Sequence, residues 1–411
     1  MVFYTKPAAS RAEELATAVR FEKYDDALAQ ANLISRPVGL LDLENFEANA
    51  RDLVQRAKGK PVRVASKSLR VRRAIEKTLS KPGYAGVLAF TLSEALWLAE
   101  CGIKDIVLGY PCTDVSVLKK FAASEIGREN ITLMIDDIEQ IEILDRAVPD
   151  RQNIRIAIDM DASYRPALGI SIGAARSPLR TAADVTKLAV AILRKPRISL
   201  VGLMAYEGQI AGVGNAASGA KGTAIRAMQK ASAMELRTRR AEAVAALQTL
   251  TDLEFVNGGG TGSIESTSSE PAVTEIAAGS GLLGPGLFDS YTHFQPKHAL
   301  FFGLNVVRRP GPNTVTVLGG GWIASGPPGA DRLPTIAWPL GLKYHGTEGP
   351  GEVQTPLSGE HASKLRLGDT VYFRHAKSGE PAERLNEIAV YSHGKIIDSW
   401  PTYRSEGKAF L

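Results

Sequence analysis

Short apolar runs alternate with amphipathic stretches over about residues 60–280. The runs have the length and the β-branched content of buried strands, and there are eight of them: Val62–Ser66, Ala85–Phe90, Asp105–Tyr110, Ile131–Ile135, Ile154–Asp159, Leu200–Tyr206, Leu253–Asn257 and Val273–Ala277. The stretches between them carry apolar residues at helical spacing and include Leu69–Leu79, Leu92–Cys101, Val115–Ala123 and Ala183–Leu193. Strands that are buried on both faces and alternate with helices are typical of parallel sheets. Eight such repeats predict a (β/α)₈ barrel, with an open doubly wound sheet as the alternative.

The pattern changes after about residue 295, where Pro and Gly become frequent and helical spacing is lost. Strand-like runs such as Thr314–Leu318, Thr370–Phe373 and Glu387–Tyr391 follow, and they predict a C-terminal all-β domain. At the other end, the first 35 residues predict a helical extension, and the strand Gly39–Leu43 leads into a helix over Glu44–Ala57. The sequence thus predicts three parts: residues 1–35, a barrel over 36–295 and a β-domain over 296–411.

Composition and charge are those of a folded protein. Hydrophobic residues make up 44% and charged residues 23% of the 411, whereas disordered chains contain few apolar residues. The net charge is +5, but the basic residues are scattered. A nucleic-acid site needs a denser basic patch with aromatic residues, so we expect none. The one cluster, Arg237, Arg239 and Arg240, is interpreted as a solvated face of a helix.

The cysteines and the N-terminus indicate a reducing compartment. Cys101 and Cys112 are the two cysteines, which are too few for a disulfide scaffold and lack the spacing of a zinc pair. Glu13, Glu14 and Arg20 leave no apolar core for a signal peptide. No apolar run approaches the roughly 20 residues that cross a bilayer. We therefore expect a cytoplasmic protein with no membrane partner.

Glycine-rich loops follow the last two predicted barrel strands. In (β/α)₈ barrels the functional residues lie at the C-terminal ends of the strands, and phosphate binds after strands seven and eight. Strand seven opens into Gly258–Ser263 and strand eight into Gly279-Ser280-Gly281. Glycines let backbone N–H groups approach an anion, and Thr261 and Ser263 add hydroxyl groups. The sequence therefore predicts a phosphate site here; the alternative is that the glycines only form turns.

Lys67 directly follows the first predicted barrel strand. Desolvation at the mouth of a barrel favours the neutral, nucleophilic form of a lysine amine. The alternative interpretation is a solvated lysine at the start of a helix. Together with the predicted phosphate loops, Lys67 points to a phosphorylated aldehyde that is held as a Schiff base.

Several segments resemble the D-threonine aldolase and D-serine dehydratase family: Val38–Asn49, Arg63–Arg70, Gly86–Gly102 and Asp105–Pro111. The similarity extends over most of residues 36–411 and preserves the order of elements. That family belongs to the fold-type III pyridoxal-phosphate enzymes, whose barrel is of the alanine racemase N-terminal type. The resemblance implies pyridoxal 5′-phosphate as cofactor and a small amino acid as substrate.

The resemblance also implies roles for individual residues. Lys67 matches the Schiff-base lysine, Arg165 an arginine near the cofactor ring, and Tyr206 a residue beside the cofactor. The implied phosphate cradle consists of Gly259, Gly260, Thr261, Ser263, Gly279 and Ser280. From the residues alone, the preferred interpretation of Arg165 is a surface ion pair, and that of Tyr206 is a packed aromatic residue of the core.

The chain departs from this family at the expected site of a divalent metal. His375 matches one ligand, but Lys377 stands at the second ligand position, and an ammonium group repels a metal ion. We therefore expect His375 to act as a base with Lys377 as its electrostatic partner, without metal. The alternative is that His375 binds a metal with Glu380 or Glu383. All six histidines follow the barrel strands, so an imidazole at the barrel mouth would come from the β-domain or from a partner in a head-to-tail homodimer.

The function implied is a lyase that acts on a β-hydroxy D-amino acid. Retro-aldol cleavage is preferred over dehydration with deamination. The enzymatic alternative is an amino acid racemase, with Tyr291 or Tyr344 as its second base. Two further functions stay open: a non-catalytic carrier of pyridoxal phosphate, and an aldolase that forms its Schiff base without a cofactor.

Overall fold

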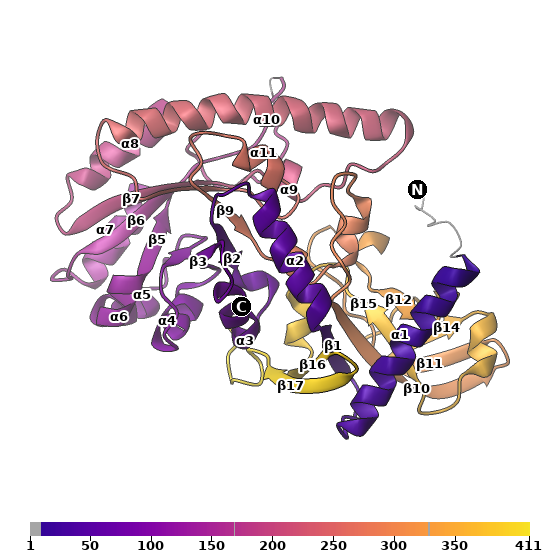
Figure 1. Ribbon diagram of the computed structural model, residues 1–411. Coiled ribbons are helices and arrows are strands. Elements are labelled where there is room, and N and C mark those ends of the chain that lie inside the picture. Colours follow the sequence, from indigo (N-terminus) through magenta and orange to yellow (C-terminus); the bar gives the residue numbers. More distant parts are fainter. Residues whose placement is uncertain (1–9, 168, 328) are drawn as a thin grey trace. The chain divides into compact units, whose positions relative to one another are not determined.

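The computed structural model describes residues 10–167, 169–327 and 329–411 (Figure 1). The chain forms two compact units. The barrel unit comprises Ala48–Leu282, Phe288–Pro296 and Lys408–Leu411. The sheet unit comprises the chain up to Glu47 together with Leu283–Leu287 and Lys297–Gly407.

Eight parallel strands close into a barrel, which confirms the predicted (β/α)₈ fold. The strands are β2 (Val62–Ala65), β3 (Tyr84–Ala89), β4 (Ile106–Leu108), β5 (Ile131–Ile135), β6 (Ile154–Asp159), β7 (Ile198–Ala205), β8 (Phe255–Gly258) and β9 (Glu275–Ala278). The first and last strands pair in parallel, with Val62 opposite Ile276. This closure excludes the open doubly wound sheet.

Helices follow the strands and lie outside the ring that the strands form (Figure 1). They are α2 (Leu43–Arg56), α3 (Arg72–Leu79), α4 (Leu92–Glu100), α5 (Val115–Ala123), α6 (Glu125–Asn130), α7 (Ile138–Ala147), α8 (Ala182–Leu193), α9 (Gly208–Ala211), α10 (Gly219–Gln248) and α11 (Ile264–Ser268). Side-chain caps fix several starting points. Thr181, for example, accepts a hydrogen bond from the amide of Asp184, whose carboxylate accepts one from the amide of Thr181.

The barrel interior combines an apolar cluster with a buried ion pair. Val107, Met134 and Phe255 belong to the cluster. Arg63 on β2 donates two hydrogen bonds of 2.7 Å to the carboxylate of Glu275 on β9. A buried charge needs such a partner, so the pair links the first and last strands of the ring.

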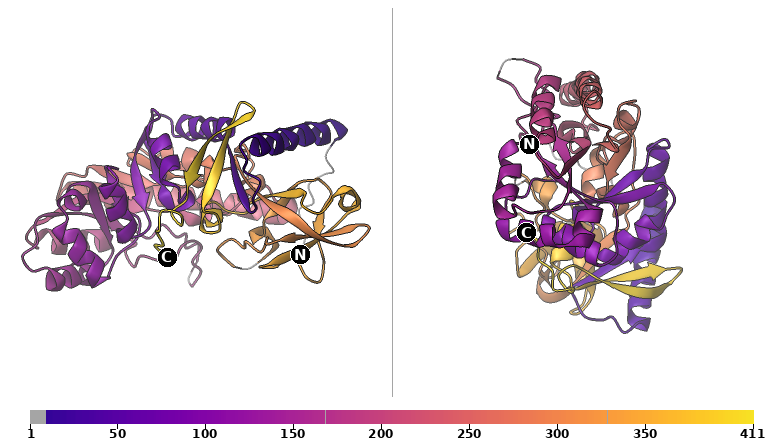
Figure 2. Two further views of the ribbon diagram at one scale, coloured as in Figure 1. Left: turned by 90° about the horizontal axis from the view of Figure 1, so that it is seen from below. Right: turned by 90° about the vertical axis from the view of Figure 1, so that its left-hand side faces the viewer.

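The sheet unit is built on nine strands, as the predicted C-terminal all-β domain requires. They are β1 (Val38–Asp42), β10 (Leu300–Gly311), β11 (Thr314–Leu318), β12 (Thr335–Trp338), β13 (Lys343–Tyr344), β14 (Gln354–Ser358), β15 (Thr370–Arg374), β16 (Glu387–Ser392) and β17 (Lys395–Pro401). The order is β13-β14-β11-β10-β1-β16-β17, with β15 between β10 and β12. Strands β16 and β17 form an antiparallel hairpin, drawn in yellow in Figure 2.

The N-terminal boundary differs from the predicted one. Strand β1 pairs with β10 and β16, so it belongs to the sheet unit rather than to the barrel. The predicted N-terminal helix is α1 (Arg11–Gln30), whose Phe21 and Tyr24 pack in one apolar cluster with Phe301 of β10. The Tyr24 hydroxyl donates to Asp42 at 2.7 Å. Sequence patterns identify these elements but not the sheet they join, because strand pairing depends on distant segments.

The interpretation of the arginine cluster on α10 is wrong in part. Arg237 is exposed, but Arg239 and Arg240 are buried. Both make ion pairs with glutamates, and these acceptors make burial of a guanidinium tolerable. No helix in the described ranges is long and apolar enough to cross a membrane.

Candidate active site

Lys67 lies in a short 3-10 turn, Ser66–Ser68, directly after β2. Its side chain is exposed, whereas Ala65, Ser66 and Ser68 are buried. The Ser66 hydroxyl donates to the carbonyl of Leu88 at 3.1 Å and so fixes the turn against β3. The turn therefore presents the Lys67 amine at the C-terminal end of the barrel, where barrel enzymes carry their chemistry.

One tyrosine contacts this amine, and an arginine joins that tyrosine to a second one. Lys67 Nζ donates to the Tyr110 hydroxyl at 2.6 Å. The Arg176 guanidinium carbon lies 5.4 Å from the ring centre of Tyr110 and 5.8 Å from that of Tyr206, within the range of cation–π attraction. Tyr206 is thus linked to Lys67 through Arg176 and Tyr110, and its role beside a cofactor stays a prediction. Tyr110 and Arg176 were not predicted.

The two phenols have different acidities. Burial would raise the pKa of Tyr110, but the positive charges of Lys67 and Arg176 outweigh it, so the pKa lies below that of a free tyrosine. Burial and the neighbouring Glu207 raise the pKa of Tyr206 to about 12. At neutral pH Tyr206 is therefore a neutral phenol, and Tyr110 is the phenol that loses its proton more readily.

The loop after β8 holds four of the predicted cradle residues, Gly259, Gly260, Thr261 and Ser263. Gly259 has a φ of +91°, which other residues rarely adopt. A Cβ on Gly260 would lie 2.7 Å from the Cβ of Ala211, so only glycine fits there without displacement. The Gly260 amide donates to the Ser263 hydroxyl at 3.1 Å. The loop is thus compact, with its backbone close to the surface of α9.

The loop after β9 holds the other two cradle residues, Gly279 and Ser280, and contacts the first loop. The hydroxyls of Thr261 and Ser280 are 3.3 Å apart, and the Gly281 amide donates to the Thr261 hydroxyl at 3.1 Å. A Cβ on Gly279 would lie 2.6 Å from the carbonyl oxygen of Ala65. The two glycine loops and the Lys67 turn therefore adjoin one another at one end of the barrel.

A buried network of ion pairs contacts the loop after β8. Arg240 of α10 donates to Glu207 at 2.9 Å and to Glu270 at 2.5 Å. Glu207 also accepts from the hydroxyls of Ser263, at 2.7 Å, and Thr267. The Ser263 hydroxyl proton is thus directed to Glu207, and the Ser263 amide donates to the carbonyl of Gly260 at 2.9 Å, so both donors of Ser263 have partners within the barrel unit. Sequence reasoning missed this network because its members are far apart in the chain.

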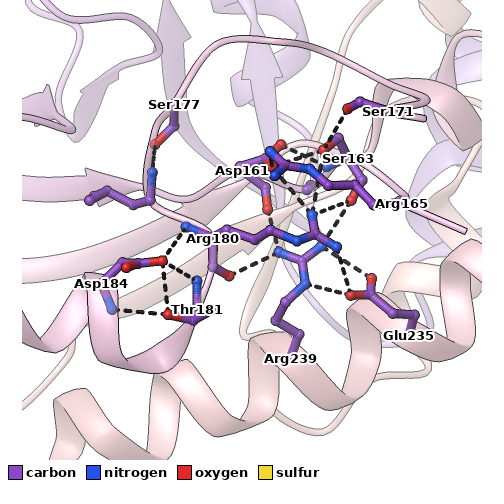
Figure 3. A network of polar contacts seen from close by, with 12 residues as sticks. Asp161, Ser163, Arg165, Ser171, Ser177, Arg180, Thr181, Asp184, Glu235 and Arg239 are labelled. Atoms are coloured by element: carbon purple, nitrogen blue, oxygen red, sulfur yellow. Dashed lines mark hydrogen bonds and ion pairs between the residues drawn. The ribbon is translucent and has the colours of Figure 1, made fainter. Parts of the chain in front are cut away.

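Arg165 lies in the loop after β6 and forms an ion pair. Its side chain is 50% exposed, and Nη2 donates to Asp161 at 3.0 Å. Asp161 also accepts from Arg180 at 3.3 Å, and Arg239 of α10 donates to the carbonyl groups of Asp161 and Ser163. Figure 3 shows the three arginines gathered around Asp161. The cation that lies over Tyr110 and Tyr206 comes from the same loop but is Arg176.

Asp159 adds a carboxyl group at the end of β6. It is buried, and burial together with the charge of Asp136 raises its pKa to about 7, against the opposing effect of Arg176. A strongly perturbed carboxyl group at a barrel mouth is a candidate functional group. The sequence offered one signal, because Asp159 is the last residue of a predicted strand.

His375 and Lys377 lie in the sheet unit, after β15. The His375 side chain is 2% exposed, and Nδ1 donates to the carbonyl oxygen of Lys377 at 2.6 Å. Burial lowers the pKa of His375 to about 4, which makes the imidazole a weaker base than predicted. The Lys377 amine donates to the carbonyl of Ser325 at 2.7 Å. The imidazole of His375 therefore contacts the backbone of Lys377, while the ammonium of Lys377 has a partner of its own.

The sequence also suggested a metal site and a tyrosine that would be the second base of a racemase. Nowhere in the described part of the chain do three His, Cys, Asp or Glu side chains gather as they would around a metal ion. The Tyr291 hydroxyl donates to the carbonyl of Ala211 at 2.9 Å, and that of Tyr344 to Pro334 at 2.9 Å. Both tyrosines named for a racemase thus have backbone partners within their own units.

The chain is similar in sequence to two curated proteins. Two curated relatives are 3-hydroxy-D-aspartate aldolases from Paracoccus denitrificans, 27% identical over 261 residues and 28% over 252. Each match covers 60% of this chain and spans 60% of the length of the relative.

Solved structures share the fold over most of the chain. D-threonine aldolase from Filomicrobium marinum superposes with a TM-score of 0.73 at 22% identity, covering 90% of this chain and 94% of its own. D-threo-3-hydroxyaspartate dehydratase from Delftia sp. HT23 gives 0.68 at 18% identity, covering 90% and 97%. Alanine racemase from Bacillus anthracis gives 0.59 at 13% identity, covering 90% and 98%.

The model of the family "Alanine racemase, N-terminal domain" matches residues 41–285. This range contains all eight barrel strands, the Lys67 turn and both glycine loops. It also covers more than half of the chain. The chain therefore belongs to the alanine racemase N-terminal domain family.

Proposed function

We propose that the chain is a pyridoxal-phosphate-dependent lyase that acts on a β-hydroxy D-amino acid, with Lys67 as the lysine that binds the cofactor. The observation that carries the proposal is the Lys67 turn: an exposed amine at the end of the first barrel strand, adjoining two glycine loops at the ends of the last two strands. A lysine and a phosphate cradle at one barrel mouth are what a phosphorylated aldehyde needs.

The residues present fit this cofactor. Side chains at Gly260 and Gly279 would collide with Ala211 and Ala65, so the two loops are built for close backbone packing. Backbone amides of such loops bind phosphate, and the hydroxyls of Thr261 and Ser280 face each other between them. Lys67 Nζ would hold the aldehyde carbon. Tyr206 and Arg176 would lie on the cofactor side of the site, with Arg165 as the alternative cation.

Pyridoxal phosphate, when bound, withdraws the electrons of a bond that breaks at the α-carbon of an amino acid. The chain must orient that bond and move protons. Lys67 and Tyr110 provide an amine and a phenol in contact, and Asp159 provides a carboxyl group with a pKa of about 7. In the scheme that the sequence predicts, His375 takes a proton from the β-hydroxyl beside Lys377 without a metal ion. The low pKa of His375 makes the groups of the barrel unit the stronger candidates for this step.

The substrate class is inferred from the relatives. The curated relatives are named as aldolases of 3-hydroxy-D-aspartate, and the structural neighbours include a D-threonine aldolase and a dehydratase of D-threo-3-hydroxyaspartate. All three names specify a β-hydroxy D-amino acid. We place retro-aldol cleavage ahead of dehydration because both curated relatives are aldolases.

Peptide mapping and a substrate assay test the proposal. Borohydride reduction of the protein loaded with pyridoxal phosphate should leave the pyridoxyl group on Lys67, and Lys67→Ala should abolish it. The loaded protein should cleave D- but not L-isomers of threonine, phenylserine or 3-hydroxyaspartate. Labelling of a different lysine, or equal turnover of both isomers, contradicts the proposal.

We further propose that the active form is a head-to-tail homodimer. The support is the distribution of histidines: five of the six lie in the sheet unit, and His293, the one in the barrel unit, lies 3.6 Å from the carboxylate of Glu265. Any other imidazole for the barrel mouth would have to come from a sheet unit. Light scattering at assay concentrations should give twice the mass of one chain. An active monomer contradicts this arrangement.

A further inference from the structure

We propose that Tyr110 is a catalytic residue that exchanges a proton with Lys67: its hydroxyl oxygen takes the proton that the Lys67 ammonium must lose before the nitrogen attacks a carbonyl carbon. The inference rests on the proposed role of Lys67 and adds a residue to it. In this view Arg176 is a positioning residue, which acts through Tyr110.

The geometry places the phenol against the reacting nitrogen. Tyr110 follows β4 by two residues, and its hydroxyl oxygen is 2.6 Å from Lys67 Nζ. Proton transfer requires heavy-atom distances of roughly 2.6–3.2 Å. Lys67 comes from the end of β2 and Tyr110 from beyond the end of β4, so strands fixed in the barrel determine the contact. The barrel strands therefore hold Lys67 and Tyr110 in contact.

The charges around Tyr110 favour its phenolate form. Lys67 reaches it from the turn after β2, Arg176 from the loop after β6, and Tyr206 from the end of β7. Two of these three groups are cations, and the third is a neutral phenol at pH 7. Arg176 also acts on the carboxyl group of Asp159, whose pKa it lowers against the larger effects of burial and Asp136. The cations outweigh burial and lower the pKa of Tyr110. A phenolate at Tyr110 can therefore form beside the ammonium group of Lys67.

The step balances as one proton transfer. An N–H bond of Lys67 breaks, an O–H bond of Tyr110 forms, and the electron pair left on nitrogen becomes the nucleophile. The charges of the pair change from one positive and one negative to two neutral groups, so the step leaves the net charge of the site unchanged. The reverse transfer protonates Lys67 when the amine is released. No oxidant, reductant or further reactant is needed.

Arg176 distinguishes this role from simple packing. A tyrosine that only fills space has no need of a guanidinium over its ring, and phenylalanine replaces it without consequence. If Tyr110 works as a base, Arg176→Met should raise the pH at which its hydroxyl ionises, and Arg176→Lys should restore part of the shift. Arg165→Met is the matched control, because Arg165 lies in the same loop but is paired with Asp161.

The first experiment follows the tyrosinate absorbance of the full chain, freed of cofactor, as the pH is raised. One tyrosine should ionise at a lower pH than the others. Tyr110→Phe should remove that early step and leave the later ones. Tyr84→Phe is the control: its hydroxyl donates to Ala50 at 2.8 Å, and burial raises its pKa, so it should leave the early step intact. An early step that survives in Tyr110→Phe overturns the inference.

The second experiment follows the rate at which the full chain captures pyridoxal phosphate at different pH values. Near neutral pH, Tyr110→Phe should capture it about 100-fold more slowly than the wild type, as expected for loss of an acid–base group. The difference should shrink at alkaline pH, where hydroxide takes the proton. Equal rates and pH profiles overturn the role of Tyr110 but leave Lys67 in place. Failure of the wild type to capture the cofactor overturns the proposed function as well, so the two failures are distinguishable.

Discussion

Replacement of Arg240 by methionine should destabilise the barrel unit strongly. Arg240 is 0% exposed and is paired with Glu207 and Glu270. Methionine is unbranched and carries no charge, so the variant leaves the carboxylates of Glu207 and Glu270 in the interior without their cation. A group left charged and unpaired in the interior loses its hydration without compensation.

The magnitude follows from the burial of all three residues. Breaking a buried ion pair by removing one partner costs about 3–5 kcal/mol. For a domain of roughly 150–250 residues, 1 kcal/mol corresponds to about 2–4 °C in melting temperature. The melting temperature of Arg240→Met should therefore fall by about 6–20 °C. Because Glu207 also holds Ser263 and Thr267, retention of pyridoxal phosphate should fall as well.

Scanning calorimetry of the cofactor-free chain measures this change, and Arg237→Met is the matched control. Arg237 lies on the same helix but is exposed, so its loss should change the stability by no more than about 0.5 kcal/mol. Lower pH should partly rescue Arg240→Met, because protonation neutralises the two carboxylates. A loss below about 1 kcal/mol, or a loss that does not depend on pH, would show that the network does not carry the stability assigned to it.

Three further predictions concern the site. Gly260→Ala should reduce affinity for pyridoxal phosphate at least about tenfold, because its Cβ would lie 2.7 Å from that of Ala211 and the loop would have to shift. Gly311→Ala, which meets no atom within 4 Å, should leave the affinity unchanged; equal affinities of the two variants would refute the cradle. Burial holds the pKa of Asp159 at about 7, above the roughly 3.9 of an unfolded chain, so the free energy of unfolding should fall by up to about 4 kcal/mol between pH 4 and 7. Asp159→Asn should abolish that fall in urea titrations. Chelator treatment should leave activity intact, and activity that one added ion restores after chelation would contradict the metal-free scheme. If His375 is the base in that scheme, His375→Ala should lower turnover with little change in cofactor binding; unchanged turnover would assign the step to the groups of the barrel unit.

Local patterns were sufficient for the fold. Each barrel strand is a short apolar run bounded by turn residues, and five of the eight are buried along their whole length, so the hydrophobic pattern determines their positions directly. Thr314–Leu318 coincides with β11 for the same reason. The strand Gly39–Leu43 is present as β1, but in the sheet unit rather than in the barrel where the pattern placed it. The pattern of five buried residues cannot indicate whether a strand pairs with β2 or with β10 and β16.

The candidate site was predictable where residues follow a strand and not where they converge from loops. Lys67 and the glycine loops directly follow strands, so the barrel rule places them at the mouth. Arg176 lies well beyond the end of β6, in a long loop, and its position depends on how that loop folds back. Tyr110 ends a predicted strand, but the sequence does not indicate a role for it. The role becomes apparent only from its contact with Lys67.

The arginines of this chain show what separates a structural cation from a functional one. Arg239 and Arg240 are buried, and their guanidinium groups bond to carboxylates and carbonyls of the same unit, so they are fixed by the protein that surrounds them. Arg165 is half-exposed, but its guanidinium group binds Asp161 of the same loop. Arg176 is exposed and lies over two aromatic rings. Cation–π attraction positions a guanidinium without neutralising its charge, so Arg176 keeps the charge with which it acts on Tyr110 and, through Tyr110, on Lys67.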